Sequence, residues 1–319
     1  MKIVIRIGVV VLSALPSLAI AHEGPRVWLS QSGEMIIPMT SDDDFDPQTY
    51  APSSVYFSAF DEYINPGGPT PIETTQFPGF EIRRDGLSNI PDGTTIGFTL
   101  AGPLLKLNAA GTALNSTDAA PRLDIALGST HRVTSTGVQD GFNFLYTGPG
   151  EHGHLTFTLL GDGSTAGAGA DGVYALPIRV TSPTLAASNW IFLILQSNNT
   201  AAERQQAAVV AQGMATALPG DANFDGTVNF VDLLVLASHY GSTSGSWWAT
   251  GDYDFDGAVN FADLLTLAAN YGKSRSAASF EATAVRTVPE PSALGGGVAF
   301  ACTLGRRGRP RAGSSVQRG

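Results

Sequence analysis

The feature that most constrains this chain is an acidic loop of twelve residues that occurs twice. The first copy runs from Asp221 to Asp232, and the second runs from Asp252 to Asp263, 31 residues later. In both copies Asp or Asn stands at loop positions 1, 3, 5, 9 and 12, and glycine stands at position 6. Because glycine permits a sharp turn, it allows positions 1, 3 and 5 to point at one centre. Each copy therefore predicts a shell of oxygen atoms around a single point.

An oxygen shell of this kind is typical of a calcium site. In a twelve-residue EF-hand-type loop, Ca²⁺ takes roughly six to eight oxygens from positions 1, 3, 5, 7, 9 and 12, where position 7 uses its backbone carbonyl. Acidic turns that bind no metal are the alternative, but each loop meets the full ligand template. We expect two calcium ions, held by Asp221, Asn223, Asp225, Thr227, Asn229, Asp232, Asp252, Asp254, Asp256, Ala258, Asn260 and Asp263.

A helix of the same pattern is expected after each loop. The two segments are 233–241 and 264–272, and each ends in a Tyr-Gly pair. Gly241 and Gly272 are well placed as C-caps, because a left-handed residue commonly ends a helix. Loop position 8 is valine in both copies, and we expect Val228 and Val259 to tie the two loops together.

Across residues 218–274 the chain resembles the type I dockerin family, in which paired loop–helix units bind two calcium ions. The resemblance implies a small all-α module that docks onto a cohesin or cohesin-like partner. Loop positions 10 and 11, however, hold Phe230-Val231 and Phe261-Ala262, where cellulosomal dockerins place small hydroxyl residues. Calcium for folding alone and calcium for protein–protein interaction therefore both stay open. Trp247-Trp248, between the loops, either covers this apolar surface or marks a different partner.

Residues 22–200 are predicted to form a mainly β domain, a β-sandwich of eight to ten strands. Short runs of β-branched and aromatic residues recur between turn signals, as in all-β folds. In the run 154–159 the alternation places Leu155, Phe157 and Leu159 toward a core. The run 190–195 is apolar on both faces, which favours a central strand. The predicted strands are 26–30, 34–38, 54–60, 94–100, 122–127, 142–146, 154–160, 173–181 and 190–196.

A connecting helix is expected at 201–217, between the β domain and the module. Thr200 and Glu203 have the spacing of a capping box, in which each side chain accepts from the other's backbone N–H. The segment that follows is rich in Ala, Gln and Glu. Leu218-Pro219-Gly220 then ends the helix and begins the next module.

Both ends of the chain carry sorting signals. Met1–Ala21 has the charged start, apolar stretch and small-x-small cleavage site of a secretory signal peptide, which favours cleavage over an N-terminal membrane anchor. After a linker at 275–287, residues 288–312 join Pro289-Glu290-Pro291 to an apolar stretch and an arginine cluster. This resembles the PEP-CTERM tag, which implies a secreted or cell-surface protein, transient membrane contact and cutting by an exosortase-type peptidase. The alternative is a plain tail, because the apolar stretch is short for a membrane span.

Net charge and cysteine content limit which classes of partner and cross-link we expect for this protein. Loss of Lys2, Arg6 and the five arginines after Pro291 would take the formal net charge from −10 to −17. So acidic a protein suits divalent cations and argues against nucleic acid. The single cysteine, Cys302, lies in the tag, so we expect a mature protein without disulfides.

A second metal site is suggested by the histidines of the β domain. His152 and His154 form a His-x-His pair, and signal cleavage would make His22 the N-terminal residue. Imidazole and amine nitrogens are good ligands for zinc or copper. The domain also resembles exported PEP-CTERM proteins under zinc-responsive repression, through the His22-Glu23 start, the segment 171–177 and the run 196–200. Solvated turn histidines that bind nothing are the alternative.

No catalytic motif is apparent in the sequence. Gly-x-Ser-x-Gly and His-Glu-x-x-His are absent, and the one Gly-Lys-Ser, at 272–274, lacks the earlier glycine of a phosphate-binding loop. The acidic run at 42–46 lacks the sixth-position glycine of a calcium loop and suits a solvated loop. The leading hypothesis is a non-catalytic surface or matrix protein. The alternative is a small polysaccharide-active glycosidase, since two carboxylates close in space suffice for that chemistry.

Overall fold

The computed structural model describes residues 26–275 except 33–34, 42–49, 64–71, 77, 83–87, 118–119, 146–151 and 162–170. The described residues belong to one compact unit of the chain. The proposed signal peptide, the acidic run at 42–46, the linker from 276 onward and the C-terminal tag lie outside them. Among the described residues, no helix is long and apolar enough to span a membrane.

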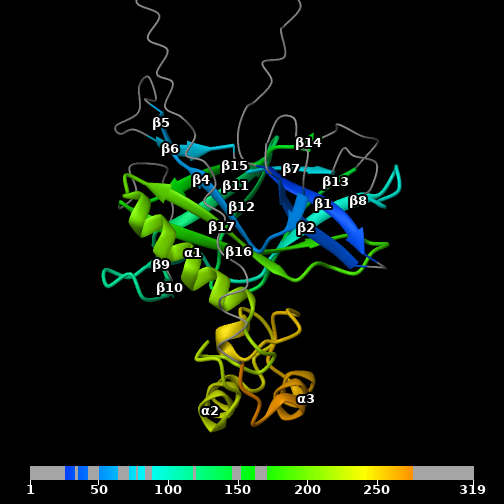
Figure 1. Ribbon diagram of the computed structural model, residues 1–319, viewed down its shortest axis with the longest axis vertical. Coiled ribbons are helices and arrows are strands. Elements are labelled where there is room, and N and C mark those ends of the chain that lie inside the picture. Colours follow the sequence, from blue (N-terminus) through cyan, green and yellow to red (C-terminus); the bar gives the residue numbers. More distant parts are fainter. Residues whose placement is uncertain are drawn as a thin grey trace, which may run out of the picture. The chain divides into compact units, whose positions relative to one another are not determined.

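The described part of the β domain holds seventeen short strands in three sheets (Figure 1). The first sheet has the order β14-β7-β1-β2-β3 and the third has the order β12-β11-β15-β6-β5. The second runs β10-β9-β16-β17-β4, with β8 also paired to β16 and β13 to β8. The strands are β1 (Arg26–Ser32), β2 (Met35–Ser41), β3 (Tyr50–Pro52), β4 (Val55–Ala59), β5 (Asp61–Tyr63), β6 (Ile72–Thr75), β7 (Gly79–Ile82), β8 (Thr95–Leu100), β9 (Leu105–Leu107), β10 (Leu114–Ser116), β11 (Arg122–Leu127), β12 (Thr130–Val133), β13 (Gln139–Leu145), β14 (His152–Gly153), β15 (Thr156–Leu160), β16 (Gly172–Thr181) and β17 (Trp190–Ser197).

The mainly β fold class is confirmed, although the strands are more numerous than the eight to ten expected. The excess comes from short strands of two to four residues, such as β5, β9 and β14, which sequence patterns do not distinguish from loops. The long strands agree better with expectation. Leu155, Phe157 and Leu159 are buried in the core, as the alternation predicts.

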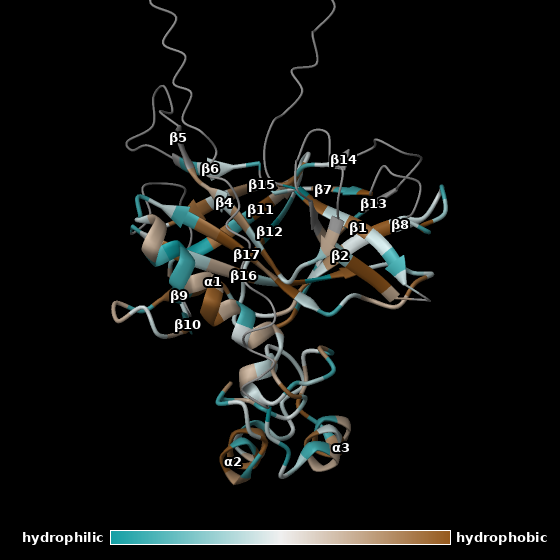
Figure 2. Ribbon diagram, in the orientation of Figure 1, coloured by the Kyte–Doolittle hydropathy of each residue, from teal (hydrophilic) through white to brown (hydrophobic). Residues whose placement is uncertain are grey.

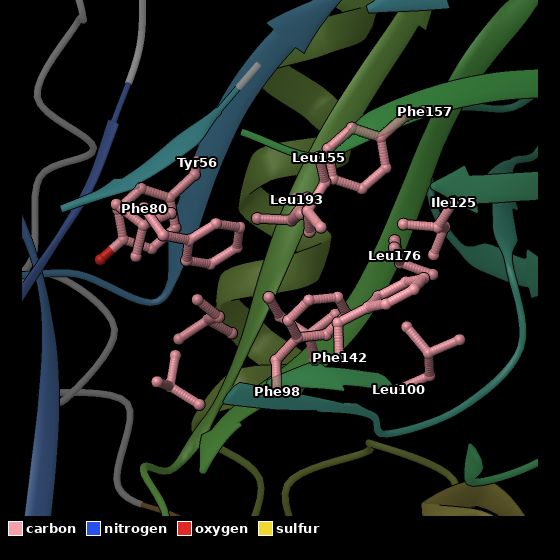
Figure 3. Packing of buried hydrophobic residues seen from close by; sticks show 14 of the residues in the cluster. Tyr56, Phe80, Phe98, Leu100, Ile125, Phe142, Leu155, Phe157, Leu176 and Leu193 are labelled. Carbon is pink, nitrogen blue, oxygen red and sulfur yellow. The ribbon is translucent and has the colours of Figure 1, made fainter. Parts of the chain in front are cut away.

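The second sheet is buried on both faces, and its central strands explain why. Along β17, Ile191, Leu193 and Leu195 enter the core between the sheets, whereas Trp190, Phe192 and Ile194 enter a second apolar cluster. This follows from the period of two in a strand, which sends alternate side chains to opposite faces. Figure 3 shows the first core, where the Phe98 and Phe142 rings lie 5.7 Å apart between centroids.

Helix α1 (Ala201–Ala215) covers part of the second face of this sheet (Figure 1). It begins at the predicted capping box. The Thr200 N–H donates to Glu203 at 3.0 Å, and the Glu203 N–H donates to the Thr200 hydroxyl at 3.2 Å. Ala207, Ala208 and Ala211 are fully buried against the strands, since small side chains allow a helix to approach a sheet closely. The predicted connecting helix is thus also part of the core.

The C-terminal module consists of α2 (Phe230–His239), the 3₁₀-helix η1 (Trp248–Thr250) and α3 (Phe261–Asn270). Helices α2 and α3 lie side by side (Figure 1). Gly241 and Gly272 follow them with φ of +89° and +80°, as expected of glycines beyond a helix end. Figure 2 shows apolar residues along β16 and β17 and on both helices of the module.

Candidate calcium-binding module

The aspartates at positions 1 and 12 form the buried floor of each loop. Asp221, Asp232, Asp252 and Asp263 are all 0% exposed, although carboxylates are seldom fully buried without a partner. The position-12 residues lie in the first turn of α2 and α3, where they accept from the backbone N–H at the helix start. Asp232 accepts from Asn229 at 2.8 Å, and Asp263 accepts from Asn260 at 2.9 Å. The helices therefore place the last carboxylate of each loop.

The first loop folds around Asp221 and Asp225. The carboxylate of Asp221 accepts from the backbone N–H of Asp225 at 3.1 Å and of Gly226 at 3.0 Å. Asp225 accepts from the N–H of Thr227 at 2.9 Å. Gly226 has φ of +85°, so the predicted turn at position 6 requires glycine. The Asp225 N–H also donates to the side-chain oxygen of Asn223 at 3.0 Å, so the side chains at positions 1 and 3 converge on the same backbone group.

The second loop repeats this geometry with carboxylates at positions 1, 3 and 5. Oxygen atoms of Asp252, Asp254 and Asp256 all lie within 4.8 Å of one another. Among the described residues, this is the one group of three or more Asp, Glu, His or Cys side chains close enough to share a metal ion. Gly257 has φ of +84°, matching Gly226 in the first loop. The donor set is all oxygen, which fits a hard cation such as Ca²⁺.

Burial changes the protonation of the position-1 aspartates. The pKa of Asp221 is raised to about 6, mainly by desolvation and also by the nearby carboxylates of Asp232 and Asp225, against backbone hydrogen bonds from Gly226 and Asp225 that lower it. Desolvation likewise raises the pKa of Asp252 to about 7. The pKa of Asp225 is lowered instead, mainly by its hydrogen bond from the Thr227 hydroxyl. A bound cation would compensate the buried charge, so the site fits calcium electrostatically as well.

The asparagines at position 9 act as helix caps. The side-chain oxygen of Asn229 accepts from the Val231 N–H at 2.7 Å, and that of Asn260 accepts from the Ala262 N–H at 2.8 Å. Their predicted role as direct or water-mediated calcium ligands stays a prediction, as do the carbonyl ligands of Thr227 and Ala258.

The two valines at position 8 join the halves of the module in a crossed manner. The Val228 N–H donates to the carbonyl of Lys273 at 3.0 Å, and the Val228 carbonyl accepts from the N–H of Gly272 at 2.8 Å, both in the segment after α3. Val259 pairs with Gly241 and Ser242 after α2, each at 2.9 Å. Each loop is therefore tied to the end of the other helix, and both valines are 0% exposed.

An aromatic cluster on the β-domain side of the loops was not predicted. Phe224 and Phe255, at loop position 4, lie against Trp190 of β17 with ring centroids 6.1 and 5.5 Å away. Trp247 and Trp248 belong to the same cluster. The suggestion that these tryptophans cover loop positions 10 and 11 was wrong, because they are buried against the second sheet. Only the strongly apolar outer face of β17 hinted at a covering element.

The module also exposes a matched set of apolar side chains. Phe230 and Phe261, at loop position 10, are 59% and 60% exposed. The same pattern recurs at equivalent positions of the two repeats. These further residues are Leu234 and Leu265 on the helices, and Tyr240 and Tyr271 at their ends.

A hollow of about 680 Å³ adjoins the first loop. The β9–β10 hairpin, α1 and Arg275 form its other walls. Asn223 and Asp225 line it, so the first loop is open to solvent on that side.

The histidine site is only partly within the described residues. His22 and the side chain of His152 lie outside them. His154 is placed just beyond β14, where its Nδ1 lies 3.0 Å from the carbonyl oxygen of Gln76. His131 is on β12, where it pairs with Asp124 at 2.9 Å. A zinc or copper site at His22, His152 and His154 stays a prediction.

Comparison with known proteins agrees with the geometry of the module. Residues 219–270 match the model of the dockerin type I domain, and this part of the chain is such a domain. Domains of this family bind calcium and dock onto cohesin partners. None of the curated proteins matches the chain significantly. Among solved structures, the chain is similar to a family 123 glycoside hydrolase from Clostridium perfringens, with a TM-score of 0.18 and 10% sequence identity. That match covers 34% of this chain and 20% of the hydrolase.

Proposed function

We propose that this chain is an exported, non-catalytic protein of the cell surface or extracellular matrix whose calcium-loaded module docks another protein. The observation that carries the proposal is the matched exposure of apolar residues in the two repeats, of which Phe230 and Phe261 are the most exposed. Contiguous exposed apolar patches mark interaction sites. Aromatic side chains commonly supply the largest share of binding energy there.

Calcium used for folding alone would not account for this surface. A module that needed only internal stability would bury these rings, as it buries Val228 and Leu236. Exposure of the same positions in both repeats instead favours a partner that binds across α2 and α3. A cohesin-like domain is the partner class that the dockerin assignment suggests.

Calcium titration of the full mature chain tests the first part of this proposal. We expect two Ca²⁺ per chain with dissociation constants of about 10⁻⁷–10⁻⁵ M, the range of sensor-type loops. Asp225→Ala and Asp256→Ala should each remove one site, because each deletes a position-5 carboxylate while leaving the other loop intact. Asp140→Ala, an exposed aspartate of β13, serves as the matched control and should keep both sites.

The same preparations test docking and the absence of catalysis. Immobilised chain should capture purified cohesin domains in calcium and release them in a chelator, and Phe230→Ala/Phe261→Ala should abolish capture. If calorimetric titration with calcium up to millimolar concentration gave no heat of binding, the prediction of two calcium sites would be wrong. Release of reducing sugar from a panel of polysaccharides would show that the protein is an enzyme instead.

We also propose the route by which the chain reaches the surface. The signal peptide at 1–21 would direct export, and the tag at 288–312 would contact the inner membrane until an exosortase-type peptidase removes it. The support is the order of charged and apolar segments at the two ends of the sequence.

A further inference from the structure

The two calcium loops share an unusual residue at position 4. Phe224 and Phe255 have φ of +62° and +65°, in the left-handed region. A bulky side chain rarely adopts this conformation, which glycine or asparagine tolerates far better. The ring is not needed for coordination, since position 4 supplies no calcium ligand. Strained backbone that recurs at equivalent positions of a repeat requires a compensating contact elsewhere.

The contacts that offset the backbone strain at Phe224 and Phe255 are made with the β domain of the same chain. The Trp190 ring contacts the position-4 phenylalanines of both loops and stacks on Trp248, with the Trp190 and Trp248 centroids 5.0 Å apart. On the neighbouring strand β16, the guanidinium carbon of Arg179 lies 4.7 Å from the centroid of the Phe255 ring. Trp190 is only 4% exposed as a result. An outer sheet face that would otherwise expose a large apolar surface is therefore covered by the loops.

The backbones of the two parts also meet. The Val138 N–H, next to β13, donates to the carbonyl of Ser246 in the connector between the loops, at 2.8 Å. A Cβ on Gly137 would collide with the backbone of Gly245, so this approach depends on glycine. The connector is in turn joined to the second loop, because the Ser246 N–H donates to the Gly257 carbonyl at 3.1 Å. A hydrogen-bonded path thus runs from the β domain to the turn of a calcium loop.

From these contacts we propose that the outer face of the second sheet, centred on Trp190, is a docking surface for the calcium-loaded loops of the same chain. Calcium binding sets the loop geometry that points both phenylalanines at Trp190. Loading therefore fixes the module against the sheet, with the α2–α3 face directed outward. Without calcium the loops lose that geometry, and Trp190 becomes accessible to solvent.

Reciprocity makes this coupling measurable. If bound calcium raises the equilibrium constant for docking of the module on the sheet, docking must raise the calcium affinity by the same factor. Such coupling typically changes an affinity by about 5–150-fold. We expect Trp190→Leu in the full mature chain to bind two Ca²⁺ at least about fivefold more weakly, although Trp190 contacts no ligand. The matched control is Val209→Ala, which shortens an exposed apolar side chain of α1 outside the loops and should bind calcium as the native chain does.

Fluorescence and scattering test the undocking itself. Three of the four tryptophans, Trp190, Trp247 and Trp248, lie in this cluster, so chelation with EGTA should shift the native emission to longer wavelength and increase the radius of gyration. Phe224→Gly/Phe255→Gly should show the undocked signal even in saturating calcium, while still binding two ions.

Two results would overturn the proposal. One is unchanged emission and radius after chelation of a native chain that demonstrably binds calcium. The other is a Trp190→Leu chain with native β structure by circular dichroism and native calcium affinity. Failure to bind calcium at all would instead contradict the proposed function, so the two ideas are tested separately.

Discussion

Asp221 and Asp252 hold the position on which each calcium loop turns. Both are fully buried, and both accept hydrogen bonds from the backbone of the loop that they close. Burial of a carboxylate disfavours its charged form, whereas the loop needs that form to bind a cation. We therefore expect these two residues to make calcium affinity depend on pH.

Calcium should stabilise the chain more at pH 7.5 than at pH 5. Burial raises the pKa of Asp221 to about 6 and of Asp252 to about 7, above the ordinary value of 3.8. Between about pH 4 and pH 7 the calcium-free folded state thus holds more protons than the unfolded state, so these groups make it less stable as pH rises. Calcium competes with those protons and gains affinity over the same range.

The measurement is the melting temperature with and without calcium at pH 5, 6 and 7.5. The increase in melting temperature caused by calcium should be larger at higher pH. Without calcium, Asp221 and Asp252 should not raise the melting temperature as pH increases. A rise that stays constant across the three pH values would contradict the assignment of buried, proton-binding carboxylates at position 1.

At the scale of elements, periodicity predicted what each strand buries but not which element covers it. The run 190–195 is apolar at every position, and β17 is indeed buried on both faces. Its outer face is covered by α1 and by the module, and neither follows from the strand's own residues. The ligand template predicted the turn at position 6, where Gly226 and Gly257 have positive φ, whereas calcium ligation at positions 1, 3, 5 and 12 stays a prediction. Phe224 and Phe255 were missed because position 4 is free of that constraint.

Helix α1 gives a prediction at this scale. Thr200→Ala removes the hydroxyl that caps the helix and should lower the free energy of unfolding by about 1 kcal/mol. Denaturant unfolding followed by circular dichroism would measure it. The matched variant is Glu203→Gln, which keeps an acceptor for the Thr200 N–H. Its free energy of unfolding should fall by less than that of Thr200→Ala. An unchanged unfolding midpoint in Thr200→Ala would mean that packing of Ala207, Ala208 and Ala211 alone holds the helix.

At the scale of the whole molecule, the sequence separates a β domain, a helix and a calcium module, and the structure joins them. One apolar cluster contains Phe192 of the β domain, Ala211 of α1 and Leu236 of the module. The repeat in the sequence delimits the module because its ligands must recur in register. The shared apolar cluster has no recognisable sequence pattern, because its residues come from segments far apart in the chain. The parts are thus recognisable in the sequence, whereas their joint core is a property of the folded chain.

The final prediction concerns which part of the chain reaches the cell surface. We expect the secreted form to begin at His22 and to end near Pro289-Glu290-Pro291, because the signal peptide and the arginine-rich tag act only during export. Intact-mass measurement of secreted protein decides both ends at once. Replacing Pro289-Glu290-Pro291 by alanines should leave the chain in the membrane fraction with its tag, whereas alanines at Ser314, Ser315 and Val316 should not. Secreted protein that keeps Arg306–Arg311 would show that the C-terminal segment is a plain tail. A form cleaved at both ends would carry a formal net charge near −17.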